Sequence, residues 1–272
     1  MGRYNRGMGI VDFHTHAFPD GLAGRAIAAL EASSGDWKAV LDGRVASLLT
    51  SMDLAGIEQS VVCPIATGPH QFPGILSWCQ AVRSPRIVPL GSVHPASEDA
   101  IGQIDQIVSA GLVGIKLHPM YQDFTVDEPR MDALYEAIAD RGLLLVLHCG
   151  QDIAYPGLDI AAPRRIAAVA QRHPTLRLVA THLGGWRMWE EVRRCLLGKP
   201  VLMETSFAVR EMAPPEAAEL IRAHGVSRVL FGTDSPWAGQ ADELALLRRL
   251  PLSSAEQRAI LEDNPRRVLA GG

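Results

Sequence analysis

Short hydrophobic runs rich in Val, Ile and Leu recur along the chain, and stretches with helical spacing of apolar residues separate them. Eight such runs can be distinguished: GIVDFH (9–14), SVVCPI (60–65), RIVPLGSV (86–93), LVGIKLH (112–118), LLLVLH (143–148), LRLVATH (176–182), VLMETS (201–206) and RVLFGTD (228–234). Runs that are apolar on both faces are typical of strands in a parallel sheet covered by helices. The pattern therefore predicts an α/β fold.

The segments between these runs predict helices, for example GRVASLLTSMDLAG (43–56) and PRRIAAVAQRHP (163–174). Eight units in 272 residues average about 34 residues each, the size of one βα repeat. We therefore expect a single (β/α)8 TIM barrel over 1–272, with an extra helix in the first connection, about 17–59. A doubly wound sheet is the alternative, but a Gly-rich phosphate-binding turn does not follow the first run.

Composition and charge indicate which partners and which cellular compartment to expect for this domain. The formal charge of −4 comes from 26 basic and 30 acidic residues without a block of like charge, so a nucleic-acid partner is not expected. The four cysteines form no Cys-x-x-Cys pair, which favours a reducing compartment. Without an export signal or membrane segment, we expect a cytoplasmic protein with no membrane partner. Residues 1–7 read as an N-terminal extension, and a homo-oligomer remains open.

Polar residues end most of the predicted strands. They are His14, His16, His94, Lys116, His118, His148, His182, Glu204 with Thr205 and Ser206, and Asp234. In a barrel, the C-terminal ends of all strands meet at one face, where the active sites of this fold lie. Because side chains alternate along a strand, His14 and His16 are expected to point to the same side, and Asp12 with them. Hydrogen bonding to backbone or water would explain one such histidine, but not their recurrence.

These side chains can form a metal site. A catalytic divalent ion takes nitrogen or oxygen ligands from rigid elements and keeps one position open for water. The residues able to supply this set are His14, His16, His148 and Asp234. Such an ion lowers the pKa of a bound water toward about 7, and a nearby carboxylate takes the proton. Asp234 is placed to act both as a ligand and as the proton acceptor.

The same residues lie in segments that resemble the amidohydrolase superfamily. These segments are DFHTH, SMDLAGIEQSVV, GIKLHPMYQDFTVDEPRMDALYEA, LLLVLHCG, LVATHLGGW, LFGTDSPW and DNPRRVL. The resemblance spans nearly the whole chain and is to the metal-dependent TIM-barrel hydrolases of the amidohydrolase 2 family, related to aminocarboxymuconate semialdehyde decarboxylase. It implies one divalent ion, zinc in the first place or manganese, held by His14, His16, His148 and Asp234. It also implies that His182 is a catalytic group beside the water, together with Asp234.

Lys116, at the end of the fourth strand, has three interpretations. Some superfamily members carboxylate a lysine at this place to bridge two ions, in which case His148 and His182 would hold the second ion. Lys116 could instead anchor a substrate carboxylate or pair with a carboxylate of the protein. A single ion with an unmodified Lys116 is the expectation, and a second metal requires the carboxylated lysine.

Four residues are predicted to contact the substrate: Lys116, His118, Arg187 and Trp237. Trp237 follows the last strand and can wall a pocket for a flat molecule, although simple loop packing is the better explanation. Arg187 falls on the same face and can pair with a substrate carboxylate, as can Arg210. Each arginine can equally be a solvated loop residue.

The leading functional hypothesis is a metal-dependent hydrolase that uses metal-activated water on a C–O or C–N bond. Its substrate would be a lactone, ester or amide of a small molecule, with a carboxylate as an option. Non-oxidative decarboxylation by the same superfamily is the alternative, and the compact length favours hydrolysis. A TatD-like nuclease would need Glu where Lys116 stands and a basic surface, and a non-catalytic barrel would have lost a ligand position.

Overall fold

The computed structural model describes residues 9–271, so the expected extension over 1–7 lies outside the described residues. Within this range the chain forms eight strands: β1 (Ile10–Thr15), β2 (Ile57–Val62), β3 (Ile87–Pro89), β4 (Gly114–Leu117), β5 (Leu144–Leu147), β6 (Arg177–Ala180), β7 (Leu202–Glu204) and β8 (Val229–Leu230). Each of the eight predicted runs contains or overlaps one strand. The strands β3 to β8 are shorter than their runs, because the polar residues that end a run mostly lie in the loop that follows.

All neighbouring strands pair in parallel, in the orders β1-β2-β3 and β4-β5-β6-β7-β8. A bridge between Gly91 and Ile115 joins β3 to β4, and a bridge between Thr15 and Ser235 joins β1 to the segment after β8. Backbone hydrogen bonds support both seams, among them Phe13 N to Phe231 O at 2.7 Å. The strands therefore follow one another around a ring, and the predicted TIM barrel is confirmed.

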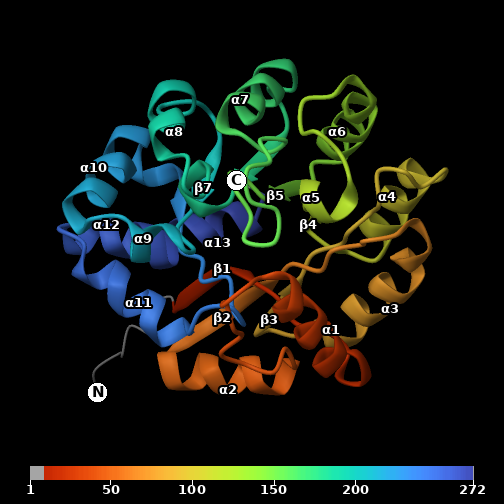
Figure 1. The fold of residues 1–272 in the computed structure, drawn as a ribbon, viewed down its shortest axis with the longest axis horizontal. Helices are drawn as coiled ribbons and strands as arrows, with labels where there is room; N and C mark the ends of the chain where they lie inside the picture. The colour runs from red at the N-terminus through yellow and green to blue at the C-terminus, as the bar shows by residue number, and fades with distance from the viewer. Residues whose placement is uncertain (1–8, 272) are drawn as a thin grey trace, which may run out of the picture.

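Helices surround the strands (Figure 1). The longer ones are α1 (Asp20–Ser33), α2 (Val45–Ala55), α3 (Phe72–Val82), α4 (Ala100–Ser109), α6 (Asp132–Asp140), α7 (Pro163–Arg172), α8 (Trp189–Cys195), α10 (Pro214–His224) and α11 (Gln240–Arg249). Shorter ones are α5 (Pro119–Gln122), α9 (Ala208–Glu211), α12 (Ser254–Arg258) and α13 (Asn264–Leu269). The first connection carries both α1 and α2, as predicted. Gly56 ends α2 with a φ of 70°, the left-handed conformation that glycine adopts without strain.

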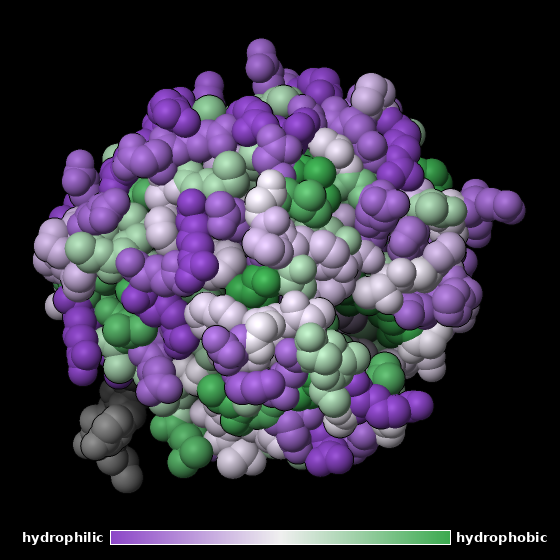
Figure 2. All heavy atoms as spheres, viewed as in Figure 1, coloured by the Kyte–Doolittle hydropathy of each residue, from purple (hydrophilic) through white to green (hydrophobic). Residues whose placement is uncertain are grey.

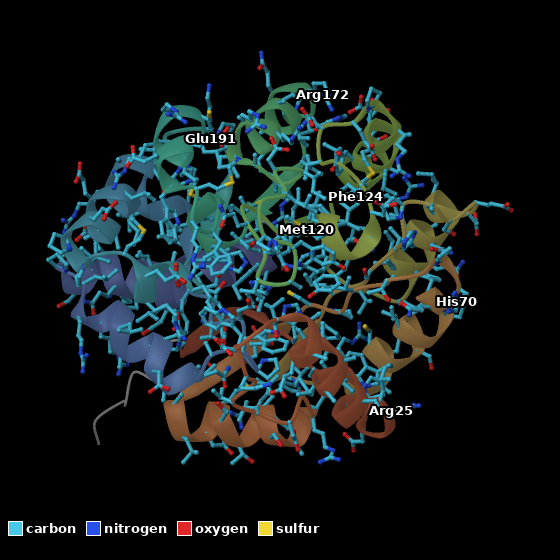
Figure 3. The ribbon with its side chains drawn as sticks, in the orientation of Figure 1. Arg25, His70, Met120, Phe124, Arg172 and Glu191 are labelled. Carbon is cyan, nitrogen blue, oxygen red and sulfur yellow. The ribbon has the colours of Figure 1, made fainter. Side chains whose placement is uncertain are left out.

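The hydrophobic core has two layers. A small cluster inside the ring combines alternate strand residues, including Phe13, Val146 and Val179, and Val268 of α13 packs against it. A larger cluster packs the outer strand faces, such as Ile115, against the surrounding helices. Side chains of hydrophilic residues dominate the outline of the face in Figure 2, whereas Met120 and Phe124 are buried within the fold (Figure 3).

One side chain ties three strand ends together below the mouth of the barrel. Gln122 of α5 accepts a hydrogen bond from the backbone N of His118 at 2.8 Å. Its amide nitrogen donates to the carbonyl oxygens of Ala66 and Val93, at 2.9 Å each. Because these carbonyls follow β2 and β3, Gln122 fixes the loops after three neighbouring strands relative to one another.

Candidate functional site

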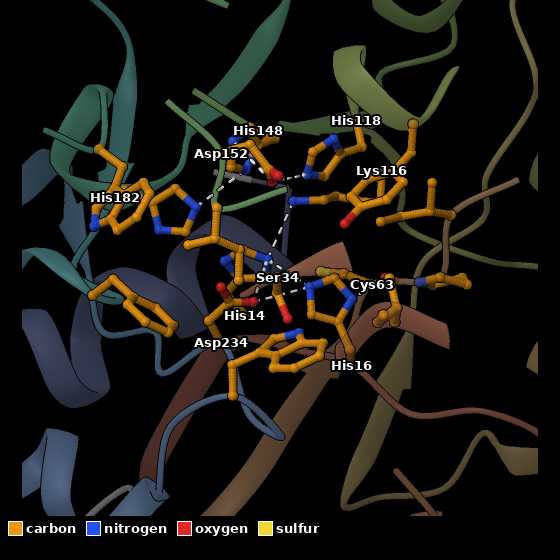
Figure 4. A pocket seen from close by; sticks show the side chains of 18 of the residues that line it. His14, His16, Ser34, Cys63, Lys116, His118, His148, Asp152, His182 and Asp234 are labelled. Atoms are coloured by element: carbon orange, nitrogen blue, oxygen red, sulfur yellow. Dashed lines mark hydrogen bonds and ion pairs between the residues drawn. The ribbon is translucent and has the colours of Figure 1, made fainter. Parts of the chain in front are cut away.

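A cavity of about 150 Å³ lies at the C-terminal ends of the strands (Figure 4). Its histidines, lysine and aspartates come from strand ends and the loops after them: His14, His16, Lys116, His118, His148, Asp152, His182 and Asp234. Its apolar lining includes Phe18, Leu30, Ile65, Ile153, Trp186, Phe207 and Trp237. The cavity thus combines titratable groups with a wall that is partly aromatic, as ligand sites commonly do.

Three of the four predicted metal ligands converge in this cavity. Nε2 of His16 lies 3.0 Å from Oδ1 of Asp234, and Nε2 of His14 lies 3.5 Å from the same oxygen. The two Nε2 atoms are 3.1 Å apart. Asp234 has a φ of 60°, an uncommon conformation for a residue with a side chain, of the kind that clusters at functional sites.

The hydrogen-bond partners of the two histidines show which nitrogen faces the cavity with a lone pair. Nδ1 of His16 lies 2.8 Å from the carbonyl oxygen of Cys63, which can only accept, so this nitrogen carries the proton. Nδ1 of His14 lies 3.1 Å from Glu204 Oε1, and Nε2 of His14 accepts from Lys116 Nζ at 3.2 Å. Both Nε2 atoms therefore carry lone pairs and lie close to Asp234, and the lone pair of His14 Nε2 is the acceptor for Lys116.

The electrostatics agree with this assignment. Burial lowers the pKa of His14 well below its usual value, and the nearby Lys116 lowers it further. Burial raises the pKa of Asp234, but the neighbouring His14 and His16 outweigh this effect, and the pKa of the carboxyl lies below its ordinary value. Neutral imidazoles and an ionised carboxylate are the protonation states in which these side chains bind metals. The donor set therefore fits a divalent cation.

His148 and His182 form a second pair beside this group. Nε2 of His182 lies 3.2 Å from Nδ1 of His148, and Nδ1 of His182 lies 3.1 Å from the carbonyl oxygen of Ser206. Nε2 of His148 lies 3.1 Å from the carbonyl oxygen of Gln151, so its Nδ1 is the nitrogen with the lone pair. His148 thus faces His182 in the same cavity and does not join the three converging ligand atoms.

His118 and Asp152 complete this side of the cavity. The rings of His118 and His148 are stacked, with centroids 4.0 Å apart and an interplanar angle of 17°. Oδ2 of Asp152 lies 3.3 Å from Nε2 of His118 and 3.8 Å from Nε2 of His148. In-plane lone pairs of two nearly parallel rings do not meet at one point, so this group is better described as hydrogen bonded than as a second metal site.

Glu204 lies directly behind the cavity, and the sequence alone assigned it no role. It is fully buried, and its Oε1 accepts hydrogen bonds from the backbone N of His182 at 2.9 Å and Ser206 Oγ at 2.8 Å, in addition to His14. Its place at the end of β7 was the only sequence signal. Asp152 was also missed, and its spacing of four residues after His148 was the available signal.

The predicted substrate contacts divide into two groups. Lys116, His118 and Trp237 line the cavity, but Arg187 does not. The Arg187 guanidinium pairs with Glu211 at 2.7 and 2.8 Å and lies 4.2 Å from the centroid of the Trp186 ring. It therefore lies behind the aromatic wall.

The expected orientation of Asp12 is wrong. Its carboxylate accepts hydrogen bonds from Thr233 and from Gln240 of α11, at 2.6 and 2.7 Å, while Val11 and Phe13 lie in the inner core cluster. The pairing of β1 with β2 shifts register between Asp12 and Thr15, so strict alternation does not extend from Asp12 to the histidines. Asp12 instead ties β1 to α11.

Comparison with known proteins bears on this site as a whole. Solved structures with the same fold include an uncharacterized TIM-barrel protein from Bordetella bronchiseptica, with 21% identity, coverage of 96% of this chain and 98% of that chain, and a TM-score of 0.78. A candidate 2-pyrone-4,6-dicarboxylic acid hydrolase from Pseudomonas putida has 18% identity, coverage of 97% and 98%, and a TM-score of 0.68. A 5-carboxyvanillate decarboxylase from Novosphingobium aromaticivorans with bound manganese has 14% identity, coverage of 98% of both chains, and a TM-score of 0.70.

None of the curated proteins compared matches the chain. No helix in the described residues 9–271 is long and apolar enough to cross a membrane. The family model described as amidohydrolase matches residues 11–270, which include all of β1 except Ile10, the whole of β2 to β8 and every polar residue of the cavity. The chain therefore belongs to the amidohydrolase family.

Proposed function

We propose that this protein is a metal-dependent hydrolase that attacks a C–O or C–N bond of a small lactone, ester or amide. The observation that carries the proposal is the convergence of lone pairs from His14 Nε2, His16 Nε2 and Asp234 Oδ1 on one point of the cavity. Metal-binding histidines commonly donate a hydrogen bond from the second ring nitrogen to a carboxylate or a carbonyl oxygen. Nδ1 of His14 and Nδ1 of His16 both do so here.

The residues that would hold the ion are His14, His16 and Asp234, with His148 as the fourth ligand in the proposal. Zinc is the first choice from the nitrogen-rich donor set, and manganese is an alternative because a structural neighbour contains it. When bound, a divalent ion supplies Lewis-acid chemistry and an activated water at neutral pH.

The protein's own groups then handle the proton. Asp234 is 15% exposed, so its carboxylate can accept a proton from the attacking water. His182 donates through Nδ1 to the carbonyl oxygen of Ser206, so Nε2 is the nitrogen that can accept a proton. The protonated ring can then stabilise negative charge that develops on the substrate. Trp186, Phe207 and Trp237 limit the access of bulk water to these groups.

Decarboxylation is the second candidate, and the comparisons give it specific support. The manganese-containing decarboxylase aligns over 98% of its chain, so the compact length of this protein no longer favours hydrolysis. Both reactions would use the same cavity and ligands. They differ in product, because hydrolysis adds water and decarboxylation releases carbon dioxide.

Elemental analysis of freshly purified protein is the first test, and we expect one equivalent of a divalent metal. A screen of lactones and of aromatic and unsaturated carboxylic acids then separates the candidates through opening of the ester bond or release of carbon dioxide. Chelator-treated protein should lose activity and regain it with added metal. Full activity after removal of all metal would refute the proposal.

A further inference from the structure

Lys116 is a buried cation without an acidic partner in the described part of the chain. Its side chain is 0% exposed, and Nζ donates to Nε2 of His14 at 3.2 Å. Among residues 9–271, no carboxylate oxygen forms an ion pair with Nζ within 4.0 Å, so the predicted pairing with a protein carboxylate is not formed. An ammonium group has three N–H donors, and leaving a buried charge unpaired is costly. Two donors are therefore available to a bound molecule.

These donors face the cavity. Lys116 lines it, and in Figure 4 the amino group points toward the middle of the site, between the side that carries His118 and Asp152 and the side that carries His14. A cavity of about 150 Å³ is the size that holds one benzene ring. The molecule that reaches Lys116 therefore has roughly the size of a single ring.

Among residues 9–271, Lys116 is also the only lysine or arginine that lines the cavity. Arg187 lies behind the aromatic wall, as described above. Arg210 lies 5.2 Å from the centroid of the Phe207 ring, and its Nε donates to Glu243 at 2.6 Å. Both arginines that the sequence suggested as carboxylate partners are thus occupied elsewhere.

The remaining lining charges are negative. Asp152 and Asp234 are the two carboxylates that line the cavity. Among the side chains of residues 9–271, Lys116 is the one that can attract a substrate carboxylate into this cavity. The proposed ion would be the other positive charge there, next to Asp234.

We propose that Lys116 is an anion subsite that binds a carboxylate of a ring-sized substrate. The inference rests on the proposed function only in that the anchored molecule is the one that the site transforms.

Isothermal titration of the metal-loaded protein with benzoate and benzamide tests the proposal without turnover. Benzoate should bind, and neutral benzamide should bind at least roughly tenfold more weakly. Lys116→Met removes the charge but keeps much of the side-chain volume, and it should weaken benzoate binding by roughly 10- to 100-fold. Lys199→Met is the matched control at an exposed lysine and should leave binding unchanged.

Equal binding of benzoate and benzamide, or failure of benzoate to bind, would overturn the proposal. So would a Lys116→Met protein that binds benzoate as well as the wild type, because the ion alone would then hold the carboxylate. A carbamate on Lys116, detected by intact mass in bicarbonate buffer, would also overturn it. If Lys116→Met does not fold, the wild-type comparison of the two ligands, repeated on chelator-treated protein, decides. If the hydrolase hypothesis fails, these binding results still stand.

Discussion

Replacement of Glu204 by Gln tests whether the carboxylate behind His14 supports the metal site. Glu204 accepts four hydrogen bonds: from His14 Nδ1 at 3.1 Å, His182 N at 2.9 Å and Ser206 Oγ at 2.8 Å on Oε1, and from Ser206 N at 2.7 Å on Oε2. An amide keeps one acceptor oxygen and turns the other position into a donor. The least disruptive orientation places the new NH2 opposite the backbone N–H of Ser206, so two buried donors face each other.

The magnitude follows from this count. Each buried polar group without a partner costs about 1 to 3 kcal/mol, and the variant has two such groups, the Ser206 N–H and the new amide NH2. Part of this cost is offset because the neutral amide is cheaper to bury than the carboxylate charge. We therefore expect Glu204→Gln to lower the free energy of unfolding by about 2 to 4 kcal/mol. Loss of a charged partner behind a metal-binding histidine typically weakens metal affinity by about 10- to 100-fold, and we expect the same here.

Two measurements check this prediction: urea unfolding of the metal-free protein, and competition for zinc against a fluorescent chelator. Glu190→Gln is the matched control, because Glu190 is 84% exposed and its side chain pairs only with Arg193. An unchanged zinc affinity alongside lower stability would show that Glu204 supports the fold and not the ion. An unchanged free energy of unfolding would show that Glu204→Gln leaves no buried polar group without a partner, and it would refute the reasoning.

Two further predictions concern the proton carrier and the acid stability of the fold. His182→Asn should leave the metal bound but lower kcat by about 10²- to 10⁴-fold. Asp234→Asn should abolish turnover and also reduce the metal content. An undiminished kcat in a His182→Asn protein with full metal would limit His182 to a structural role. Hydrogen bonds from Arg222 and from the backbone N of Ser253 hold the pKa of Glu256 at about 2, below its ordinary 4.5. Because this pKa is depressed, the stabilisation is present above pH 4.5 and is lost as the pH falls toward 2. Glu256→Gln should therefore flatten the decline of the urea midpoint across this pH range, and an identical decline in wild type and variant would contradict the assignment.

The barrel could be predicted because its signal is local and repeated. Each strand is a short apolar run, and the helical spacing between runs sets the alternation that places all strand ends at one face. For the same reason, His14, His16 and Asp234 could be assigned to one site from sequence, and they meet in the cavity. Their assignment as ligands remains a prediction, and so does that of His148.

Other features depend on contacts that the local pattern does not contain. The register shift in β1 separates Asp12 from the histidines that follow it, and a shift of this kind is set by pairing with the neighbouring strand. Arg187 carries the same charge whether it faces a substrate or an internal partner. Its actual partner, Glu211, lies 24 residues away along the chain, so only the folded structure brings the two together.

The histidines of the site show why the identity of candidate metal-binding side chains does not by itself define the geometry of the site. An imidazole can present either nitrogen to an ion, and the choice depends on the acceptor that holds the other nitrogen. The carbonyl oxygen of Cys63 and the carboxylate of Glu204 make His16 and His14 present Nε2, whereas the carbonyl oxygen of Gln151 makes His148 present Nδ1. Two of these three acceptors are backbone groups, which leave no trace in residue identity. The histidines could therefore be identified from sequence, but the direction in which each one binds follows only from the fold around it.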